Sequence, residues 1–328
     1  MAEPTCWMDL ETPAALVDVD RMAANLEKVG EYCSKWGIAY RPHAKTHKSA
    51  ELARAQLAAG AVGVAVATTR EAEVMAAVCQ DILLAYPPVG RGRLKRLLAL
   101  PPQAQLSVAL DSSQAVRGLA RAATAAGRQV TVLIEVEMGM GRVGVQGTSE
   151  AVRLAEETAG SAGIQYGGIL IYPGHIRRPV GEQLPDIQAS TARLATLLET
   201  LAGAGLPPTV VSGGSTPTLF NSHLMTGVTE VRPGTWIFND RTTALLEACH
   251  WTECAYSVLA TVVSTSVPGQ VVVDAGSKTL AKEEVRATFR DPAVAAGFGC
   301  VLDRPELRVK AMSEEHGVID LAGSSWRP

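Results

Sequence analysis

The sequence lacks an apolar run long enough to cross a bilayer, and no basic segment followed by an apolar one stands at its start. We therefore expect neither a membrane span nor a secretory signal. It also lacks an excess of charge, because the formal net charge is only −3 at pH 7. A protein without a strong basic field has no electrostatic attraction for nucleic acid or an anionic membrane, so neither is an expected partner.

Cysteine is scarce, and its spacing forms no Cys-x-x-Cys motif. The six cysteines are Cys6, Cys33, Cys79, Cys249, Cys254 and Cys300. Scattered thiols of this kind are typical of a reducing compartment, so we predict a cytoplasmic protein. The one close group is Cys249, His250 and Cys254, whose spacing matches no usual metal site.

The pattern that is present is an alternation of short apolar strands with longer helical stretches, in a chain of 328 residues with 47% apolar content. Such alternation is typical of a parallel α/β fold. We predict eight strands, at residues 39–43, 62–66, 82–86, 106–110, 130–136, 168–172, 209–211 and 230–232. Eight strands with helices between them predict a (β/α)8 TIM-like barrel, in which functional groups gather at the carboxyl ends of the strands.

The character of the chain changes after about residue 250, where residues 254–263 and 270–274 read as strands without helices between them. We predict a barrel over residues 21–250, preceded by a short strand within residues 1–20. A second, mostly β domain is expected over residues 251–328, and it looks truncated because few closing strands are visible.

A basic octapeptide, Arg41-Pro42-His43-Ala44-Lys45-Thr46-His47-Lys48, stands at the carboxyl end of the first predicted barrel strand. Residues two apart on a strand share a face, so Arg41, His43 and Lys45 are expected to point the same way. Like charges around Lys45 would lower the pKa of its amine, and a neutral lysine can attack an aldehyde to form a Schiff base. A solvated basic turn is the alternative.

The octapeptide resembles the pyridoxal phosphate lysine motif of the D-threonine aldolase and D-serine dehydratase family, fold-type III enzymes with an alanine-racemase-like barrel. The resemblance implies that Lys45 carries the cofactor. It also implies that the N-terminal strand near Leu16 joins the β domain, and that the enzyme is a homodimer with its site near the interface.

The cofactor's phosphate needs an anion-binding turn, and the turn after the seventh predicted strand offers one. Two adjacent glycines let backbone N–H groups approach an anion, and serine and threonine hydroxyls add donors. A plain glycine turn is the alternative. The predicted members are Ser212, Gly213, Gly214, Ser215 and Thr216.

Two further residues complete the predicted cofactor-binding set, together with His43. Arg142 lies in Gly139–Gly144, a G-x-G-x-x-G pattern that is a weak dinucleotide fingerprint because no helix opens directly behind it. The resemblance instead implies a loop that carries Arg142 to the cofactor. Tyr172 ends the sixth strand, where it is expected to stack on or hydrogen-bond the cofactor. The alternative for Arg142 is a surface arginine, and the alternative for Tyr172 is a core aromatic residue.

His175 follows a Pro-Gly turn at the barrel mouth, so we predict that it transfers protons on the substrate side, beside the catalytic Lys45. The family pattern has a second histidine where this chain has Arg178. The family also holds a divalent metal, zinc or manganese, with a His-x-Cys or His-x-Asp pair beyond a segment resembling Glu315-His316-Gly317. No such pair follows Gly317, so the expected metal has no ligands in this chain. We expect the chain to be a fragment; a protein that has lost the metal is the alternative.

The resemblance implies a pyridoxal-phosphate-dependent lyase acting on small D-3-hydroxyamino acids. Retro-aldol cleavage and elimination of the hydroxyl group remain open as the reaction. The alternatives are a PLP-binding homeostasis protein without turnover and an amino-acid racemase, although no clear second base opposite Lys45 is visible.

Overall fold

The computed structural model describes residues 6–283, 285, 287–289, 291–321, 323–324 and 326. Its chain forms two compact units. One comprises Leu26–Ile176 and Val180–Thr235, and the other comprises Met1–Asn25, Arg177–Pro179 and Trp236–Pro328. The predicted limits differ, because residues 21–25 and 236–250 group with the β-rich unit. The amide of Asn25 explains part of this, since it donates to the carbonyls of Ile237 and Glu253 at 3.2 and 2.9 Å.

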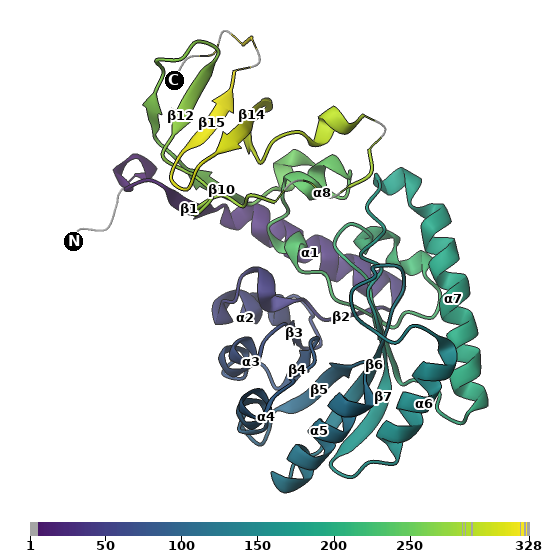
Figure 1. The fold of residues 1–328 in the computed structure, drawn as a ribbon. Helices are drawn as coiled ribbons and strands as arrows, with labels where there is room; N and C mark the ends of the chain where they lie inside the picture. Colours follow the sequence, from purple (N-terminus) through teal and green to yellow (C-terminus); the bar gives the residue numbers. More distant parts are fainter. Residues whose placement is uncertain are drawn as a thin grey trace. The chain divides into compact units, whose positions relative to one another are not determined.

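Eight parallel strands form the barrel of the larger unit (Figure 1). Their order is β2-β9-β8-β7-β6-β5-β4-β3, and a parallel bridge between His43 and Ala65 joins the two ends of this order. The predicted barrel is therefore confirmed. The strands are β2 (Ala39–Tyr40), β3 (Val64–Val66), β4 (Asp81–Leu84), β5 (Gln105–Leu110), β6 (Val130–Val136), β7 (Ile164–Ile171), β8 (Val210–Gly213) and β9 (Glu230–Val231).

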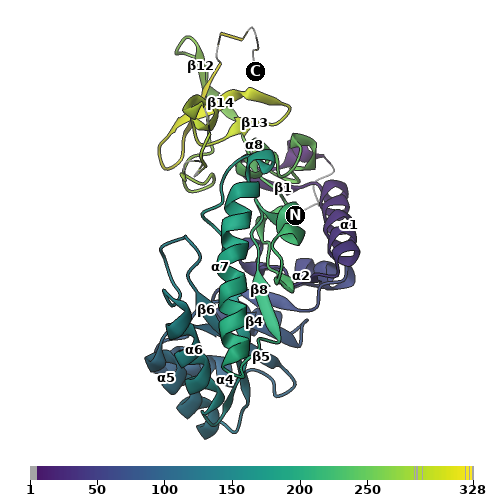
Figure 2. The same ribbon diagram turned by 90° about the vertical axis from the view of Figure 1, so that its right-hand side faces the viewer.

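Helices surround the strands, and polar side chains fix where several of them begin. Ser49, Thr68 and Ser112 each accept a hydrogen bond from a backbone N–H of the first helical turn. The helices are α1 (Val19–Trp36), α2 (Ala50–Ala58), α3 (Thr69–Met75), α4 (Arg91–Leu98), α5 (Ser113–Ala125), α6 (Thr148–Ala159) and α7 (Leu184–Gly203). Figure 2 shows α7 along its length. Among the described residues, no helix is long and apolar enough to span a membrane.

Strand residues alternate between two cores. Outward side chains such as Val132 and Ile134 join a large cluster with the helices. A smaller cluster fills the barrel interior, and its buried members are Ala65, Leu83, Ala109, Leu133 and Leu170. Because Leu170 also lines the cavity described below, the inner cluster forms the floor of that cavity.

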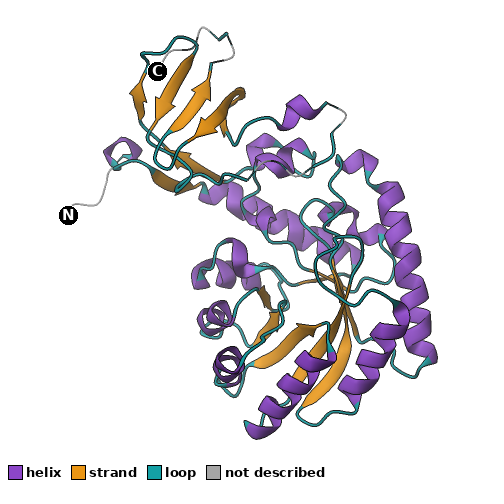
Figure 3. Cartoon of the chain, viewed as in Figure 1, coloured by secondary structure: helices purple, strands orange, loops and turns teal. Residues whose placement is uncertain are grey.

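The β-rich unit holds two antiparallel sheets, drawn in orange with the other strands in Figure 3. In the first, β1 (Ala14–Val17) pairs with β10 (Tyr256–Leu259), so the N-terminal strand joins this unit. The second has the order β11 (Val262–Ser264), β12 (Gln270–Val273), β15 (Gly317–Asp320), β14 (Arg304–Met312) and β13 (Cys300–Val301). A short helix, α8 (Arg241–Leu245), precedes them.

Two predictions for this unit need correction. The single strand expected over residues 254–263 is two strands in different sheets. The strand pairing is interrupted at Thr261, whose N–H donates to Asp274 Oδ1 at 2.8 Å. The strands β13, β14 and β15 are not among the predicted ones, because their pairing depends on partners distant in the sequence.

Candidate functional site

A cavity of about 150 Å³ opens at the carboxyl ends of the barrel strands. Six of the nine predicted cofactor-binding residues line it: His43, Lys45, Arg142, Tyr172, Ser215 and Thr216. Its walls also include polar residues that the sequence analysis did not select, Glu135, Arg232 and Thr235. Segments at or after the ends of β2, β4, β6, β7, β8 and β9 therefore converge on one polar hollow.

Lys45 lies on a single turn of 3-10 helix, η2 (Ala44–Thr46), which begins directly after His43. The expectation that Arg41, His43 and Lys45 share a strand face is wrong, because β2 ends at Tyr40 and the backbone turns before Lys45. The imidazole Nδ1 of His43 accepts from the Lys45 N–H at 3.4 Å. His43 thus supports the turn that presents the lysine.

The pKa of Lys45 is lowered, as the basic octapeptide predicted, although the charged neighbours that lower it lie outside the octapeptide. The main cause is loss of hydration, followed by the positive charges of Arg142 and Arg232, while Glu71 opposes them. The side chain nevertheless keeps access to solvent at the cavity rim. Lys45 is therefore an accessible amine with an increased neutral fraction, which is the state that attacks an aldehyde.

Arg41 is withdrawn from the cavity by two ion pairs, a buried one with Glu230 and a partly buried one with Asp81. Its Nη1 and Nη2 lie 2.7 and 3.0 Å from the two carboxylate oxygens of Asp81, and its Nε lies 2.7 Å from Glu230 Oε2. Burial alone would lower the pKa of Arg41, but the two carboxylates outweigh it and raise that pKa. The charge of Arg41 is thus compensated inside the barrel wall.

Arg232 is the main functional candidate that sequence reasoning missed. It directly follows β9 and is 7% exposed. Its Nη1 donates to Ser212 Oγ at 2.5 Å and its Nη2 donates to the carbonyl of Ile171 at 3.0 Å. Burial lowers its pKa to about 10, against the opposing charges of Glu230 and Glu135. An arginine after a buried strand, at the carboxyl end of a barrel, was the available signal.

Ser212 has a different place from the predicted one. Its side chain is fully buried and bridges Glu230 and Arg232. It does not line the cavity, and neither does Gly213 or Gly214. Gly214 has φ +78°, a conformation that favours glycine, and this turns the chain so that Ser215 and Thr216 reach the cavity.

The loop after β6 places Arg142 over Tyr172, with the guanidinium carbon 5.3 Å from the ring centroid. Glu137 shapes this loop, since its Oε1 accepts from the N–H groups of Gly139 and Gly141, both at 2.7 Å. The next helix, α6, begins only at Thr148. The G-x-G-x-x-G pattern therefore forms an irregular loop. In a dinucleotide fingerprint the same pattern leads directly into a helix.

His175 is exposed beside this loop, where its ring lies against Gly139. Burial lowers its pKa, opposed by Asp186 and Glu137. It is not among the residues that line the cavity. Its catalytic part stays a prediction.

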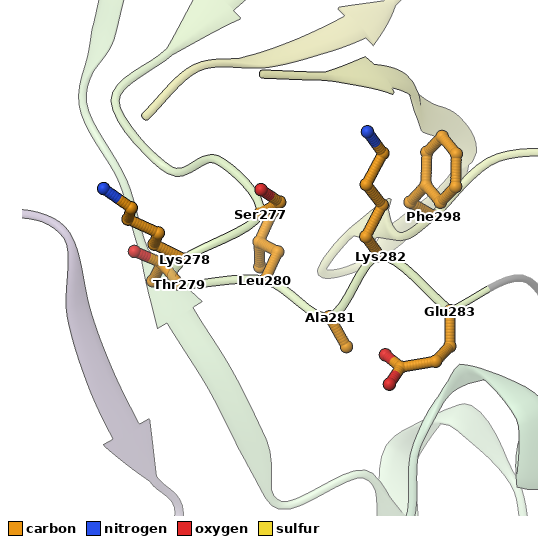
Figure 4. A pocket seen from close by; sticks show the side chains of 8 residues that line it. All are labelled: Ser277, Lys278, Thr279, Leu280, Ala281, Lys282, Glu283 and Phe298. Atoms are coloured by element: carbon orange, nitrogen blue, oxygen red, sulfur yellow. The ribbon is translucent and has the colours of Figure 1, made fainter. Parts of the chain in front are cut away.

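A larger hollow, of about 890 Å³, belongs to the β-rich unit (Figure 4). It is lined by residues 277–283 and Phe298. One of its cations, Lys278, pairs with Glu314 and Glu315 at 3.2 Å each. The barrel cavity is the better candidate site, because the carboxyl ends of parallel strands meet there. Over the described residues, no group of three or more His, Cys, Asp or Glu side chains could hold a metal ion.

Known proteins resemble this chain over both compact units. Residues 17–242 match the family model "Alanine racemase, N-terminal domain", and residues 255–328 match "Putative serine dehydratase domain". The chain is 34% identical over 323 residues to D-threo-3-hydroxyaspartate dehydratase of Delftia sp. (strain HT23), which covers 95% of this chain and 84% of the relative. It is 29% identical over 327 residues to D-threonine aldolase of Arthrobacter sp., at 97% and 82% coverage. The crystal structure of D-threonine aldolase from Filomicrobium marinum superimposes with a TM-score of 0.86 at 30% identity, covering 98% of this chain and 85% of that one.

Proposed function

Because this chain belongs to the D-threonine aldolase and D-serine dehydratase family, with its alanine-racemase-like barrel, we propose that it is a pyridoxal-phosphate-dependent lyase of D-3-hydroxyamino acids. The observation that carries the proposal is the position of Lys45. Its amine, with a lowered pKa, shares one cavity with two guanidinium groups and the hydroxyl groups of Ser215 and Thr216, among others.

The donor set of the cavity fits this cofactor. Lys45 would hold the aldehyde carbon through its amine, and the hydroxyl groups of Ser215 and Thr216 would bind the phosphate. Arg142 and Arg232 add positive charge for an anionic ligand. When bound, pyridoxal phosphate supplies a conjugated ring that withdraws electrons from the substrate amino acid.

The residues around Lys45 then have defined tasks. A hydrogen-bonded chain inside the barrel wall orients Arg232. It runs from Arg41 through Glu230 to Ser212. Tyr172 lies under the guanidinium of Arg142 and fixes its position at the rim. His175, whose pKa burial lowers, would accept a proton from substrate at its imidazole.

A metal does not fit the described residues, since they contain no group of three or more suitable ligands. We therefore assign no step to zinc or manganese. Assays with and without added zinc or manganese would show whether the protein uses one.

We also propose a cytoplasmic homodimer. The six free cysteines support the reducing compartment.

The products identify the reaction. With D-threonine, retro-aldol cleavage gives glycine and acetaldehyde, whereas elimination gives 2-oxobutanoate and ammonia. With D-threo-3-hydroxyaspartate, the same reactions give glycine and glyoxylate, or oxaloacetate and ammonia. Product analysis of the purified protein loaded with cofactor would distinguish them.

Other results would contradict the proposal. Interconversion of D- and L-amino acids without cleavage would indicate a racemase. Cofactor binding with no product from any D-3-hydroxyamino acid, with or without zinc or manganese, would indicate a binding protein without turnover.

A further inference from the structure

Glu135 places a carboxyl group in the cavity that no role described above uses. It is the sixth residue of β6, and the strand alternation turns it inward with Leu133 while Ile134 packs outward. The residue is 5% exposed and lines the cavity. Among the described residues, no hydrogen bond or ion pair reaches its carboxyl oxygens, so the group faces the space that a ligand would fill.

Charged groups surround it on several elements. Arg232 approaches from the end of β9, Arg142 from the loop after β6, and Asp111 from the end of β5. Burial raises the pKa of Glu135 to about 7, and Asp111 adds to this, although the two arginines oppose it. The cavity also holds the ionisable side chains of His43, Lys45 and Tyr172.

Resting on the function proposed above, we propose that Glu135 is a proton-holding residue of the cofactor cavity. Its carboxyl group keeps a proton while the anionic cofactor is bound and donates it in a hydrogen bond to an acceptor there. Ionised carboxylates only accept hydrogen bonds, so an anionic ligand in front of Glu135 favours the protonated acid. Cofactor binding at neutral pH therefore takes up a proton from solvent at Glu135.

The first arm of the test uses the cofactor-free protein and compares the wild type with Glu135→Gln. The pKa of an unfolded glutamate is about 4.3, and burial raises the pKa of Glu135 in the folded state to about 7. Because the folded pKa is the higher one, the folded state is favoured at low pH and that advantage is lost as the pH rises between these values. The melting temperature of the wild type should therefore fall relative to Glu135→Gln across this window.

Two control variants sharpen this arm. Glu199→Gln, at an exposed position on α7, should follow the wild-type curve. Asp111→Asn removes a like charge and should move the window to lower pH. Parallel curves for the wild type and Glu135→Gln would overturn the inference.

The second arm adds pyridoxal phosphate and measures proton uptake near pH 7.5, by calorimetry in buffers of different ionisation heat. The wild type should take up a larger part of one proton than Glu135→Gln does. Equal uptake would overturn the part of the inference that concerns the cofactor. Should the wild type bind no cofactor, the proposed function fails and this part fails with it, whereas the melting curves still decide whether Glu135 holds a proton.

Discussion

The guanidinium of Arg232 donates a 2.5 Å hydrogen bond to the hydroxyl oxygen of Ser212, inside the wall of the barrel. The same hydroxyl group donates to Glu230. Ser212 thus joins a buried carboxylate to the arginine that enters the cavity, and this bridge fixes the direction of Arg232.

Replacing that serine tests the bridge. Ser212→Ala leaves a buried carboxylate oxygen and a guanidinium N–H without their partner, which costs about 1–3 kcal/mol of unfolding free energy. Cofactor affinity should fall as well, because Arg232 loses its anchor. The matched control is Ser222→Ala, whose buried hydroxyl donates to the Thr218 carbonyl at 3.1 Å and does not touch Arg232. Equal cofactor affinity in the two variants, measured by titration, would show that the bridge does not position Arg232.

The ion pairs of buried Arg41 should matter far more for stability than an exposed pair of the same geometry. Arg41→Met leaves buried Glu230 without the guanidinium that pairs with it, and should cost about 3–5 kcal/mol. Arg96→Met removes a bidentate contact with Glu73, at 2.7 and 3.0 Å, from a surface position, and should cost much less, because solvent screens the exposed pair. Urea unfolding measures both variants. A similar loss in the two would contradict a structural role for the ion pairs of Arg41.

Removing the positive charge of Arg142 should raise the pKa of Lys45. Arg142 is the second cause of the lowered pKa after loss of hydration, so the pKa should rise part of the way in Arg142→Gln. The pH profile for reaction of the cofactor-free protein with pyridoxal should then move to higher pH, with a slower rate at neutral pH. Arg121→Gln, at an exposed site on α5, is the control. An unmoved profile for Arg142→Gln would contradict the electrostatic account.

Gly234 lines the cavity and has no room for a side chain. A Cβ there would lie 2.8 Å from Thr46 Oγ1 and 3.4 Å from His43 Cβ. Gly234→Ala should therefore cost about 1–3 kcal/mol of unfolding free energy through overpacking, and it should displace the turn that carries Lys45 and weaken cofactor binding. Thr46→Ala in the same chain should restore part of the affinity. Gly92→Ala, in α4 with no atom within 4 Å of the added Cβ, should leave affinity unchanged.

The sequence revealed most of the barrel because its strands are local apolar runs. The predicted strand over residues 130–136 coincides with β6, and the prediction that Lys45 carries the cofactor came from the resemblance of the octapeptide to the family's lysine motif. The β-rich unit was harder, since strand β14 reads as mixed polar and apolar and acquires its partners only in the folded sheet.

The missed parts of the site depend on residues distant in the chain. Arg41 and Glu230 are separated by 189 positions, so no local pattern could show that the arginine of the octapeptide belongs to the barrel wall. Glu135 did carry a signal, as a carboxylate at an inward position of a buried strand. Reading the two faces of β6 separately would have selected it.

The central claim is that the amine of Lys45 binds the aldehyde of the cofactor. Reduction of the cofactor-loaded protein with borohydride, followed by peptide mapping, tests this most directly. We predict that the pyridoxyl group is found on Lys45 and that Lys45→Ala carries none. A label on another lysine, such as Lys48, or a wild-type protein without any label would contradict the account.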